Sequence, residues 1–437
     1  MAEGHHRFSG DVPLTGASTA AGSRQLGLKD CSAMQDTELL QMALGVQPPW
    51  IVANSTFDAP AKRLDIHMDF PRGSRFSCPD CGAGDCPAHD TEEKTWRHLN
   101  FFQHEAYLHA RVPRVKCPSC GVKRVSVPWA RDGSGFSLLF ESLVMTMMTS
   151  MPVAAVGRLV GEHDTLLWRV LHHYVEEARD RADHSDVTRA AFDETAARRG
   201  HDYVSLFVDL DGPRVLFVTE GKDATTVEKF AADLAEHGGS AENVTEVCID
   251  MSPAFIKGTT AHLPNANITF DKFHAIKIIN EAVDLVRRAE QIDRPELKKT
   301  RYIWLKNESN LTKDQRETFG GLADLHLKTA RAYQIRLAFQ DLYAQPSSEA
   351  ARAFLKKWYF WATHSRLAPI IKAARTIKSH WEGILRWFES KIANGILEGI
   401  NSLVQAAKAK ARGYRSTRNL KAIIYLIAGR LELKLPT

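Results

Sequence analysis

Three acidic residues, far apart in the chain, stand where metal-dependent chemistry would need them. Asp250 comes directly after Thr245–Ile249, an alternating run that predicts a strand. Asp193 ends a similar short run, Arg189–Phe192, and Glu398 lies much further downstream in a helical pattern. If folding brings their carboxylates together, they form an oxygen-rich site of the kind that Mg2+ or Mn2+ binds. Each acid is therefore a candidate metal ligand, but only if the other two lie beside it.

The elements predicted between residues 189 and 288 show how the two aspartates could meet. They come in the order strand, strand, strand, helix, strand, helix, strand and long helix. Their ranges are Arg189–Asp193, Tyr203–Leu210, Val215–Glu220, Ala224–His237, Thr245–Asp250, Ser252–Thr260, Asn267–Asp271 and Ala275–Arg288. This is the order of an RNase H-like fold, in which the first and fourth strands are neighbours. Asp193 and Asp250 would then meet across adjacent strands of a mixed sheet with flanking helices.

Four cysteines form two short motifs of the same type, Cys78-Pro-Asp-Cys81-Gly and Cys117-Pro-Ser-Cys120-Gly. The glycine after each pair permits a turn that directs both sulfurs at one ion. Four thiolates at this spacing favour a structural zinc ion. The alternative is two pairs of reduced thiols.

The segments around these motifs suit a zinc ribbon, because Tyr107–Pro113 and Lys123–Pro128 both resemble strands. Cys86 and His89 follow the first motif closely. Either could replace a zinc ligand or help to hold a second ion, and ordinary packing or exposure is the alternative.

Two short helices predicted after the ribbon have the lengths and spacing of a helix-turn-helix. They are Pro152–Gly161 and Thr165–Arg181, separated by a turn of a few residues. The second helix would present Arg169 and His172 to the major groove of DNA. A plain helical hairpin that links two domains would produce the same pattern, so both interpretations stay open.

The region 275–393 is helical throughout and carries five tryptophans. They are Trp304, Trp358, Trp361, Trp381 and Trp387. Most are expected in a core, although aromatic rings beside lysines could also stack on unpaired bases. The region has its own apolar periodicity, which predicts an insertion domain.

A last long helix is predicted from Asn394 to about Ala411. Its apolar stripe, expected to be buried, is Ile396, Ile400, Leu403, Val404 and Ala407. The opposite stripe carries Glu398, Asn401, Gln405, Lys408 and Arg412. We interpret this polar stripe as an acid that holds metal, followed by amides and cations that run along DNA. A solvated helix face is the alternative.

The basic residues are concentrated at the C-terminal end of the chain. The region 402–431 contains no acid. Its predicted DNA-binding cations are Lys408, Lys410, Arg412, Arg415 and Arg418. Such a segment is typical of one that binds a polyanion. The alternative is a solvated tail without a binding role.

Length and composition limit how the chain can be organised into domains. The chain has 437 residues and a net charge of +5, and that length predicts several units rather than one core. No signal peptide and no apolar run of about 20 residues is present, so we expect a cytoplasmic, nucleoid-associated protein without membrane contact. The expected segments are a disordered N-terminus (1–36), a zinc ribbon (37–135), a helix-turn-helix (136–185), a first core part (186–274), a helical insertion (275–393) and a second core part with a basic end (394–437).

Several of these motifs together resemble one known family. They are the two cysteine motifs, WRHLNFF with ARVPRVKCPSC, the FDE and IDMSPAF strands, DKFHAIK, and NGILEGIN with KARGYRSTRN. In this combination they resemble the ISL-three family of bacterial insertion-sequence transposases, from about Glu38 to Leu433. The resemblance implies an α+β multidomain protein, in which an RNase H-like DDE core is interrupted by an all-helical insertion behind a zinc ribbon and a helix-turn-helix.

The resemblance also implies an activity and its residues. The catalytic acids map to Asp193, Asp250 and Glu398, with Mg2+ or Mn2+ as cofactor, and His274 with Asp271 matches a D-x-x-H feature of similar transposases. Many relatives have histidine where Cys120 stands. The implied reaction is cleavage at terminal inverted repeats in double-stranded DNA, followed by strand transfer, by two-metal chemistry. A homodimer or larger assembly would pair two ends.

Two other classes of function stay open. The chain could be a structure-selective nuclease or resolvase with the same core, or a DNA-binding regulator whose core is inactive. The presence of all three acids argues against the regulator.

Overall fold

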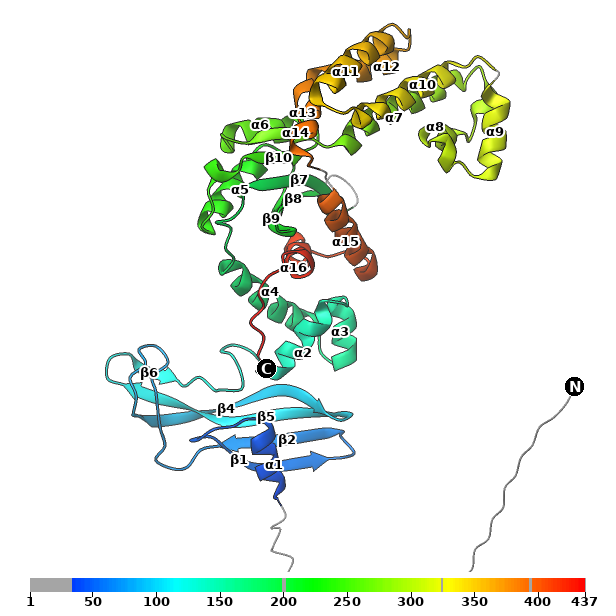
Figure 1. Ribbon diagram of the computed structural model, residues 1–437. Coiled ribbons are helices and arrows are strands. Elements are labelled where there is room, and N and C mark those ends of the chain that lie inside the picture. Colours follow the sequence, from blue (N-terminus) through cyan, green and yellow to red (C-terminus); the bar gives the residue numbers. More distant parts are fainter. Residues whose placement is uncertain (1–33, 199–201, 324, 393–394, 437) are drawn as a thin grey trace, which may run out of the picture. The chain divides into compact units, whose positions relative to one another are not determined.

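The computed structural model describes residues 34–198, 202–323, 325–392 and 395–436 (Figure 1). It divides into two compact units, Met1–Gly135 and Phe136–Thr437. The predicted disordered N-terminus lies, up to residue 33, outside the described residues, as does Asn394 at the predicted start of the last helix. Among the described helices, none has both the length and the apolar character needed to span a bilayer.

The first unit is a helix followed by a six-stranded sheet in the order β1-β2-β5-β4-β3, with β6 paired to β5. The elements are α1 (Asp36–Ala43), β1 (Ile51–Asp58), β2 (Arg63–Asp69), β3 (Arg75–Phe76), β4 (Cys86–Phe101), β5 (His104–Cys117) and β6 (Gly121–Arg124). The predicted strand Tyr107–Pro113 lies inside β5. The predicted strand Lys123–Pro128 is wrong beyond Arg124, because β6 ends where its pairing with Arg114 of β5 ends.

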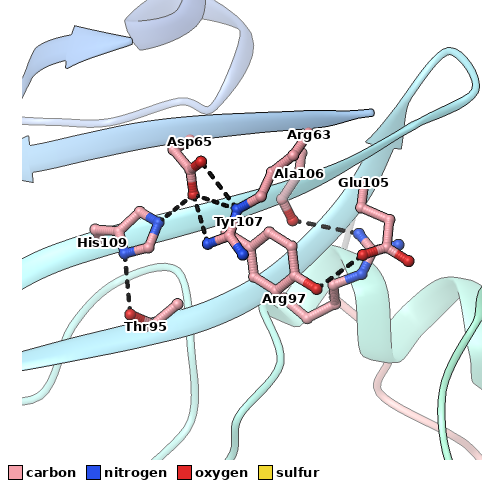
Figure 2. Close-up of polar contacts among 8 residues, drawn as sticks. All are labelled: Arg63, Asp65, Thr95, Arg97, Glu105, Ala106, Tyr107 and His109. Atoms are coloured by element: carbon pink, nitrogen blue, oxygen red, sulfur yellow. Dashed lines mark hydrogen bonds and ion pairs between the residues drawn. The ribbon is translucent and has the colours of Figure 1, made fainter. Parts of the chain in front are cut away.

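One face of this sheet is polar. In β2 the side chains of Leu64, Ile66 and Met68 are buried, so the residues between them point to the other face. There the side chains of Asp65 and His109 contact each other (Figure 2), with Asp65 Oδ1 2.6 Å from His109 Nε2. The Nδ1 of the same imidazole lies 2.9 Å from Thr95 Oγ1. These cross-strand contacts join β2, β5 and β4 through side chains as well as through the backbone.

The second unit begins with three helices, α2 (Leu138–Met148), α3 (Val153–Val160) and α4 (Asp164–Asp180). The predicted helix pair is confirmed, with each end shifted by one residue. Gly161 ends α3 in the left-handed region with φ 78°. A Cβ at Gly157 would lie 2.7 Å from the carbonyl oxygen of Glu162, so only glycine allows the chain to turn this tightly into α4.

A five-stranded mixed sheet follows, in the order β11-β10-β7-β8-β9. Its strands are β7 (Arg189–Ala196), β8 (Tyr203–Asp209), β9 (Arg214–Glu220), β10 (Glu246–Ile249) and β11 (Asn267–Phe270). β7, β8 and β9 are antiparallel, whereas β10 is parallel to both β7 and β11. The first and fourth strands of the sheet are therefore neighbours, as predicted.

The predicted end of the first strand is wrong. Asp193 lies inside β7, which continues to Ala196 because β8 offers a paired backbone as far as Tyr203. The parallel ladder to β10 stops earlier, with the pair of Ala191 and Cys248. Asp193 thus stands where β7 keeps one neighbour and loses the other.

Helices pack against this sheet and bury its apolar residues. They are α5 (Thr225–Glu236), α6 (Pro253–His262) and α7 (Lys272–Glu290). The rings of Phe207 on β8 and Phe230 on α5 stack with their centroids 4.6 Å apart. A Cβ at Gly258 of α6 would lie 2.7 Å from a methyl group of Val227, so α5 and α6 touch at this point.

The region between α7 and residue 393 is helical, as predicted. Its helices are α8 (Arg301–Leu305), α9 (Lys313–Ala323), α10 (Lys328–Gln340), α11 (Ser348–Thr363), α12 (Ala368–Ser379), α13 (Trp381–Leu385) and α14 (Trp387–Ser390). Trp304, Trp358 and Trp381 are buried, whereas Trp361 is exposed. One hydrophobic core runs without a break from the strands into these helices.

Two helices complete the chain, α15 (Gly395–Ala411) and α16 (Thr417–Ala428). The backbone N–H of Val218 in β9 donates to the hydroxyl of Tyr425 in α16 at 2.9 Å. The Arg179 guanidinium of α4 lies 4.9 Å from the centroid of the same ring. α16 therefore connects the sheet to α4 through one buried tyrosine.

Candidate active site

The pairing of β7 with β10 places two of the predicted acids opposite each other. The last paired residues are Ala191 and Cys248. Continuing this register by two residues sets Asp193 opposite Asp250, on the same side of the parallel strands. Asp250 Oδ1 accepts a hydrogen bond from the backbone N–H of Ser252 at 2.9 Å, which fixes its carboxylate at the turn into α6.

The environment of Asp193 disfavours its negative charge. Burial raises the pKa of this carboxyl to about 6, and the charges of Asp250 and Glu194 act in the same direction. The backbone N–H of Glu194, which donates to Asp193 Oδ1 at 2.8 Å, and the charge of His274 oppose the shift without cancelling it. A carboxyl pair of this kind gains from a nearby cation, which would remove the repulsion.

The next strand, β11, adds a histidine to the same cluster. Asp271 follows β11, is only 3 % exposed, and caps α7 by accepting from the backbone N–H of Phe273 at 3.3 Å. Its other oxygen lies 3.1 Å from Nδ1 of His274. This bond raises the pKa of His274, and the charges of Asp193 and Asp250 raise it further against the effect of burial. His274 is therefore held close to both predicted acids by a buried partner.

Helix α15 contacts the cluster although it lies 208 or more positions away in sequence. Asn401 Nδ2 donates to Asp193 Oδ2 at 2.8 Å, and Gln405 Nε2 donates to Thr195 Oγ1 at 2.6 Å. One turn further along, the Lys408 ammonium donates to the carbonyl oxygen of Ala196. The polar stripe of α15 thus lies along the edge of β7.

One residue of the predicted buried stripe of α15 is wrong, whereas Val404 is buried and Ile396, Ile400 and Ala407 are half-buried as members of that stripe. Leu397 and Val404 are buried, but Leu403, which was expected in the buried stripe, is 45 % exposed. The reason is that α15 is turned so that Asn401 and Lys408, beside the buried Leu397 and Val404, contact the polar end of β7. Whether Asn401 and Lys408 also touch DNA stays a prediction.

Glu398 lies on the same stripe, one helical turn before Asn401. Side chains at i and i+3 of a helix are neighbours, with Cβ atoms about 5–6 Å apart. Glu398 is exposed, whereas Asn401 is already bonded to Asp193. Glu398 therefore lies one helical turn from Asn401, the residue of α15 that contacts Asp193.

One acid of the cluster was missed by sequence reasoning. Burial raises the pKa of Glu194, and its charge interacts with those of Lys222, Asp250 and His274. Only Asp193 of the adjacent Asp-Glu pair was predicted as a site residue. The adjacency of two acids in FDE was the available signal.

The predicted DNA-binding residues of α4 and α16 occupy one region of the second unit. Arg169 is exposed on α4. His172 Nε2 lies 3.0 Å from Asn419 Oδ1, and Arg418 forms a 2.7 Å ion pair with Glu176. These contacts hold α16 against the outer side of α4.

The basic loop between α15 and α16 lies beside α4 as well. The ring of its Tyr414 packs edge-on against Trp168 of α4, with centroids 6.2 Å apart. Arg412 and Arg415 are exposed on this loop. At the end of α15, Lys410 Nζ donates to the carbonyl oxygen of Ser150 at 2.6 Å, in the turn between α2 and α3.

A second candidate site lies in the first unit, where the four predicted zinc ligands converge. One sulfur from each of Cys78, Cys81, Cys117 and Cys120 lies within 4.8 Å of the others. The glycines after the two motifs have φ 71° and 77°, the left-handed conformation that such turns require. Backbone N–H groups of Cys120 and Ser119 lower the pKa of Cys117 to about 6. Four clustered thiols, one of which is readily ionised, fit a tetrahedral zinc ion.

The two neighbouring candidates do not join this group of four. Cys86 is buried beside it, where its thiol donates to the carbonyl oxygen of Ala83 at 3.5 Å and burial raises its pKa. His89 is exposed on β4. The fourth member of the cluster is the thiol of Cys120, not a histidine.

Comparison with known families gives three matches in chain order. A family model described as "zinc-finger of transposase IS204/IS1001/IS1096/IS1165" matches residues 74–120. One described as "Helix-turn-helix domain of transposase family ISL3" matches residues 125–175. One described as "Transposase", of the ISL3 DDE type, matches residues 191–424. The last match covers more than half of the chain and spans Asp193, Asp250, His274 and Glu398.

Individual proteins are similar over most of their length. The chain is 28 % identical over 396 residues to the transposase for insertion sequence element IS1001 of Bordetella parapertussis, covering 87 % of this chain and 96 % of that protein. It is 27 % identical over 387 residues to the transposase for insertion sequence element IS1557 of Mycobacterium tuberculosis, covering 81 % of this chain and 84 % of that protein.

Proposed function

Because this chain belongs to the ISL3 family of transposases, we propose that it cleaves DNA at the terminal inverted repeats of an insertion sequence and joins the freed ends to target DNA. The observation that carries the proposal is the hydrogen bond from Asn401 to Asp193. It ties the helix that bears Glu398 to the strand that bears Asp193, beside Asp250. This bond supports a site that the three acids, scattered over the sequence, form together.

The sheet supports the proposal that this is an RNase H-like core. Three antiparallel strands, of which the first pairs in parallel with the fourth and the fourth with the fifth, have the order and directions of that fold. In the proposed core, residues 275–393, which include most of α7 and all of α8 to α14, are the insertion between β11 and α15. Its end is anchored on the sheet, because a Cβ at Gly383 of α13 would lie 2.5 Å from the ring of Phe270 in β11.

The proposed roles follow from the donor types and their surroundings. Asp193, Asp250 and Glu398 offer carboxylate oxygens, the ligands that Mg2+ and Mn2+ prefer. Two such ions, when bound, lower the pKa of an attacking hydroxyl and stabilise the leaving oxygen of an in-line displacement. Asn401 orients Asp193 by its hydrogen bond. His274, held by Asp271, would orient the scissile phosphate or carry a proton.

Contacts to DNA are proposed for the helix-turn-helix and the basic segment together. Arg169 of α4 and the exposed Arg412, Arg415 and Arg418 belong to elements that pack on each other through Trp168 and Tyr414. A helix with exposed polar residues flanked by cations suits a groove and its phosphates. The reaction must hold two element ends, so we expect a dimer or larger assembly to act.

Cleavage and joining by the purified full-length protein test the proposal. The substrate is a labelled duplex that ends in the inverted repeat flanking its own gene, with Mg2+, Mn2+ or a chelator. We expect metal-dependent nicking at the repeat boundary and joining to a target plasmid. Asp250→Ala should abolish both while leaving binding of the duplex intact, whereas the exposed Glu228→Ala on α5 should change neither.

The outcomes separate the three candidate functions. Nicking without joining would favour a nuclease or resolvase. Binding of the repeat without nicking under any metal condition would favour a DNA-binding regulator. Nicking by Asp250→Ala at the wild-type rate would show that the site is misassigned.

A further inference from the structure

The outer surface of α11 and α12 combines cations with exposed aromatic rings. The 32 residues between Glu349 and Glu382 contain no acid. Their cations are Arg352, Lys356, Lys357, Arg366, Lys372, Arg375 and Lys378. The whole chain, by contrast, has 57 basic and 52 acidic residues. This second acid-free stretch is separate from the C-terminal one and belongs to a different pair of helices.

On α11 the rings and the lysines share one face. The buried face is formed by Ala351, Leu355, Trp358 and Ala362. The opposite arc carries Lys356, Lys357, Phe360, Trp361 and His364, which are all exposed. Their spacing places all five within less than half of the helix circumference.

The two largest side chains on this face are unusually accessible. Phe360 is 64 % exposed and Trp361 is 42 % exposed, although neighbouring Trp358 is buried in the core. The ring of Phe360 stacks on His364 at a centroid distance of 4.0 Å. Two aromatic rings kept in water beside lysines cost hydrophobic free energy unless a partner covers them.

Helix α11 is linked through α13 to the strands that precede the candidate active-site residues. Arg352 of α11 makes two hydrogen bonds of 2.7 and 2.6 Å to Glu382 of α13. Arg386, between α13 and α14, pairs with Glu246 of β10 at 3.2 Å. Through these contacts the aromatic face keeps a set position relative to Asp250 and Asp271, which follow β10 and β11.

We propose that this face of α11 binds unpaired bases of the DNA end by stacking on Phe360 and Trp361, while the surrounding cations hold the phosphates. Paired bases inside a duplex offer no free ring face, whereas a nicked or frayed end does. The positive charge without acids favours a polyanion over an apolar protein partner. This inference rests on the proposed function, because that reaction creates the ends.

The test measures binding rather than cleavage, so it does not depend on catalysis. Full-length protein is titrated, in a chelator, against two fluorescent probes. One is a blunt duplex with the inverted repeat, and the other is the same duplex with a short single-stranded extension containing 2-aminopurine. For the extended probe we expect tighter binding and a quenched 2-aminopurine signal, as stacking requires.

Variants identify the rings and the cations separately. Phe360→Ala with Trp361→Ala should weaken binding of the extended probe about tenfold or more and leave the blunt probe unchanged. Lys356→Ala with Lys357→Ala should make the slope of log K against log salt concentration shallower for the extended probe, by about 0.7 for each lost phosphate contact. Tyr302→Ala, which removes another exposed ring of the helical region, should bind both probes like wild type. Phe360→Tyr with Trp361→Phe should restore stacking.

Other results would overturn the inference. Equal binding of both probes by wild type and by the double alanine variant would show that the rings do not contact bases. A change in sedimentation of the double alanine variant without a change in DNA binding would assign the face to a protein interface. Loss of blunt-duplex binding would indicate a folding defect, and thermal melting with the ring-restoring variant then decides whether stacking is involved. A wild-type protein that fails to cut the blunt duplex with Mg2+ would instead refute the proposed function.

Discussion

The side-chain amide of Asn401 donates a hydrogen bond of 2.8 Å to the carboxylate of Asp193, across 208 positions of sequence. Asp193 precedes the helical region 275–393 in the sequence and Asn401 follows it, so this bond joins the parts of the chain before and after that region. It occupies one oxygen of Asp193, and the backbone N–H of Glu194 occupies the other. Asp193 is therefore oriented from both sides.

The first prediction concerns this bond. Asn401→Ala should lower the cleavage rate about 10- to 100-fold, because loss of a residue that orients a metal ligand weakens metal binding or activity by that factor. A titration of Mg2+ against cleavage should show a higher requirement for the ion. Gln405→Ala is the matched control, since Gln405 bonds to Thr195 and not to an acid. Wild-type metal dependence in Asn401→Ala would refute the orienting role.

The second prediction concerns zinc. The purified protein should contain one zinc ion per chain, and Cys78→Ser should lose it together with the fold of the first unit, because such sites supply folding free energy directly. Metal analysis and limited proteolysis measure the two effects. Cys86→Ser should keep its zinc. The second unit should resist proteolysis in both variants, since it has its own core.

The third prediction concerns the contact between the helical region and the sheet. Gly383→Ala should lower the free energy of unfolding by about 1–3 kcal/mol, because the new methyl group would overlap the ring of Phe270 in β11. Gly320→Ala is a fitting control: it lies in α9, and an added Cβ there meets no atom within 4 Å. It should stabilise the protein by about 0.5–1 kcal/mol. Chemical denaturation compares the two, and an equal effect would contradict the close contact.

The fourth prediction concerns pH. Burial, with the nearby charges of Arg179 and His237, lowers the pKa of His184 to about 3. Below its ordinary value of 6.5 the unfolded chain therefore binds a proton that the folded chain does not. Stability is complete above pH 6.5 and should fall by about 1.4 kcal/mol per pH unit from there toward pH 3.

Substitution of His184 isolates this effect. His184→Gln leaves a polar group for Arg179 Nη1, which lies 3.3 Å from His184 Nε2. Urea denaturation at pH 7 and pH 5 should then show a smaller loss of stability than in wild type. The partly exposed His173→Gln should leave the difference between the two pH values unchanged. A wild-type slope in His184→Gln would show that another group titrates.

The order of elements could be predicted because it depends on local patterns. Strand and helix periods repeat within a few residues, and each of the two cysteine motifs carries its own glycine turn. The ends of elements were less accurate. β7 extends past Asp193 because the next strand, β8, pairs with its polar residues, and the polar residues 193–196 carry no apolar alternation of their own to show this.

The sequence by itself determined which residue types were available: four thiols for zinc, acids at 193, 250 and 398, and a basic end. Only the tertiary structure decided how far α15 is turned about its axis, so that Asn401 donates to Asp193 while Leu403 of the expected buried stripe is exposed. The physical reason is that the backbone hydrogen bonds of a helix are the same whichever of its faces becomes buried. The choice is made by the partner surface, here the polar edge of β7, and that surface is assembled from residues two hundred positions away.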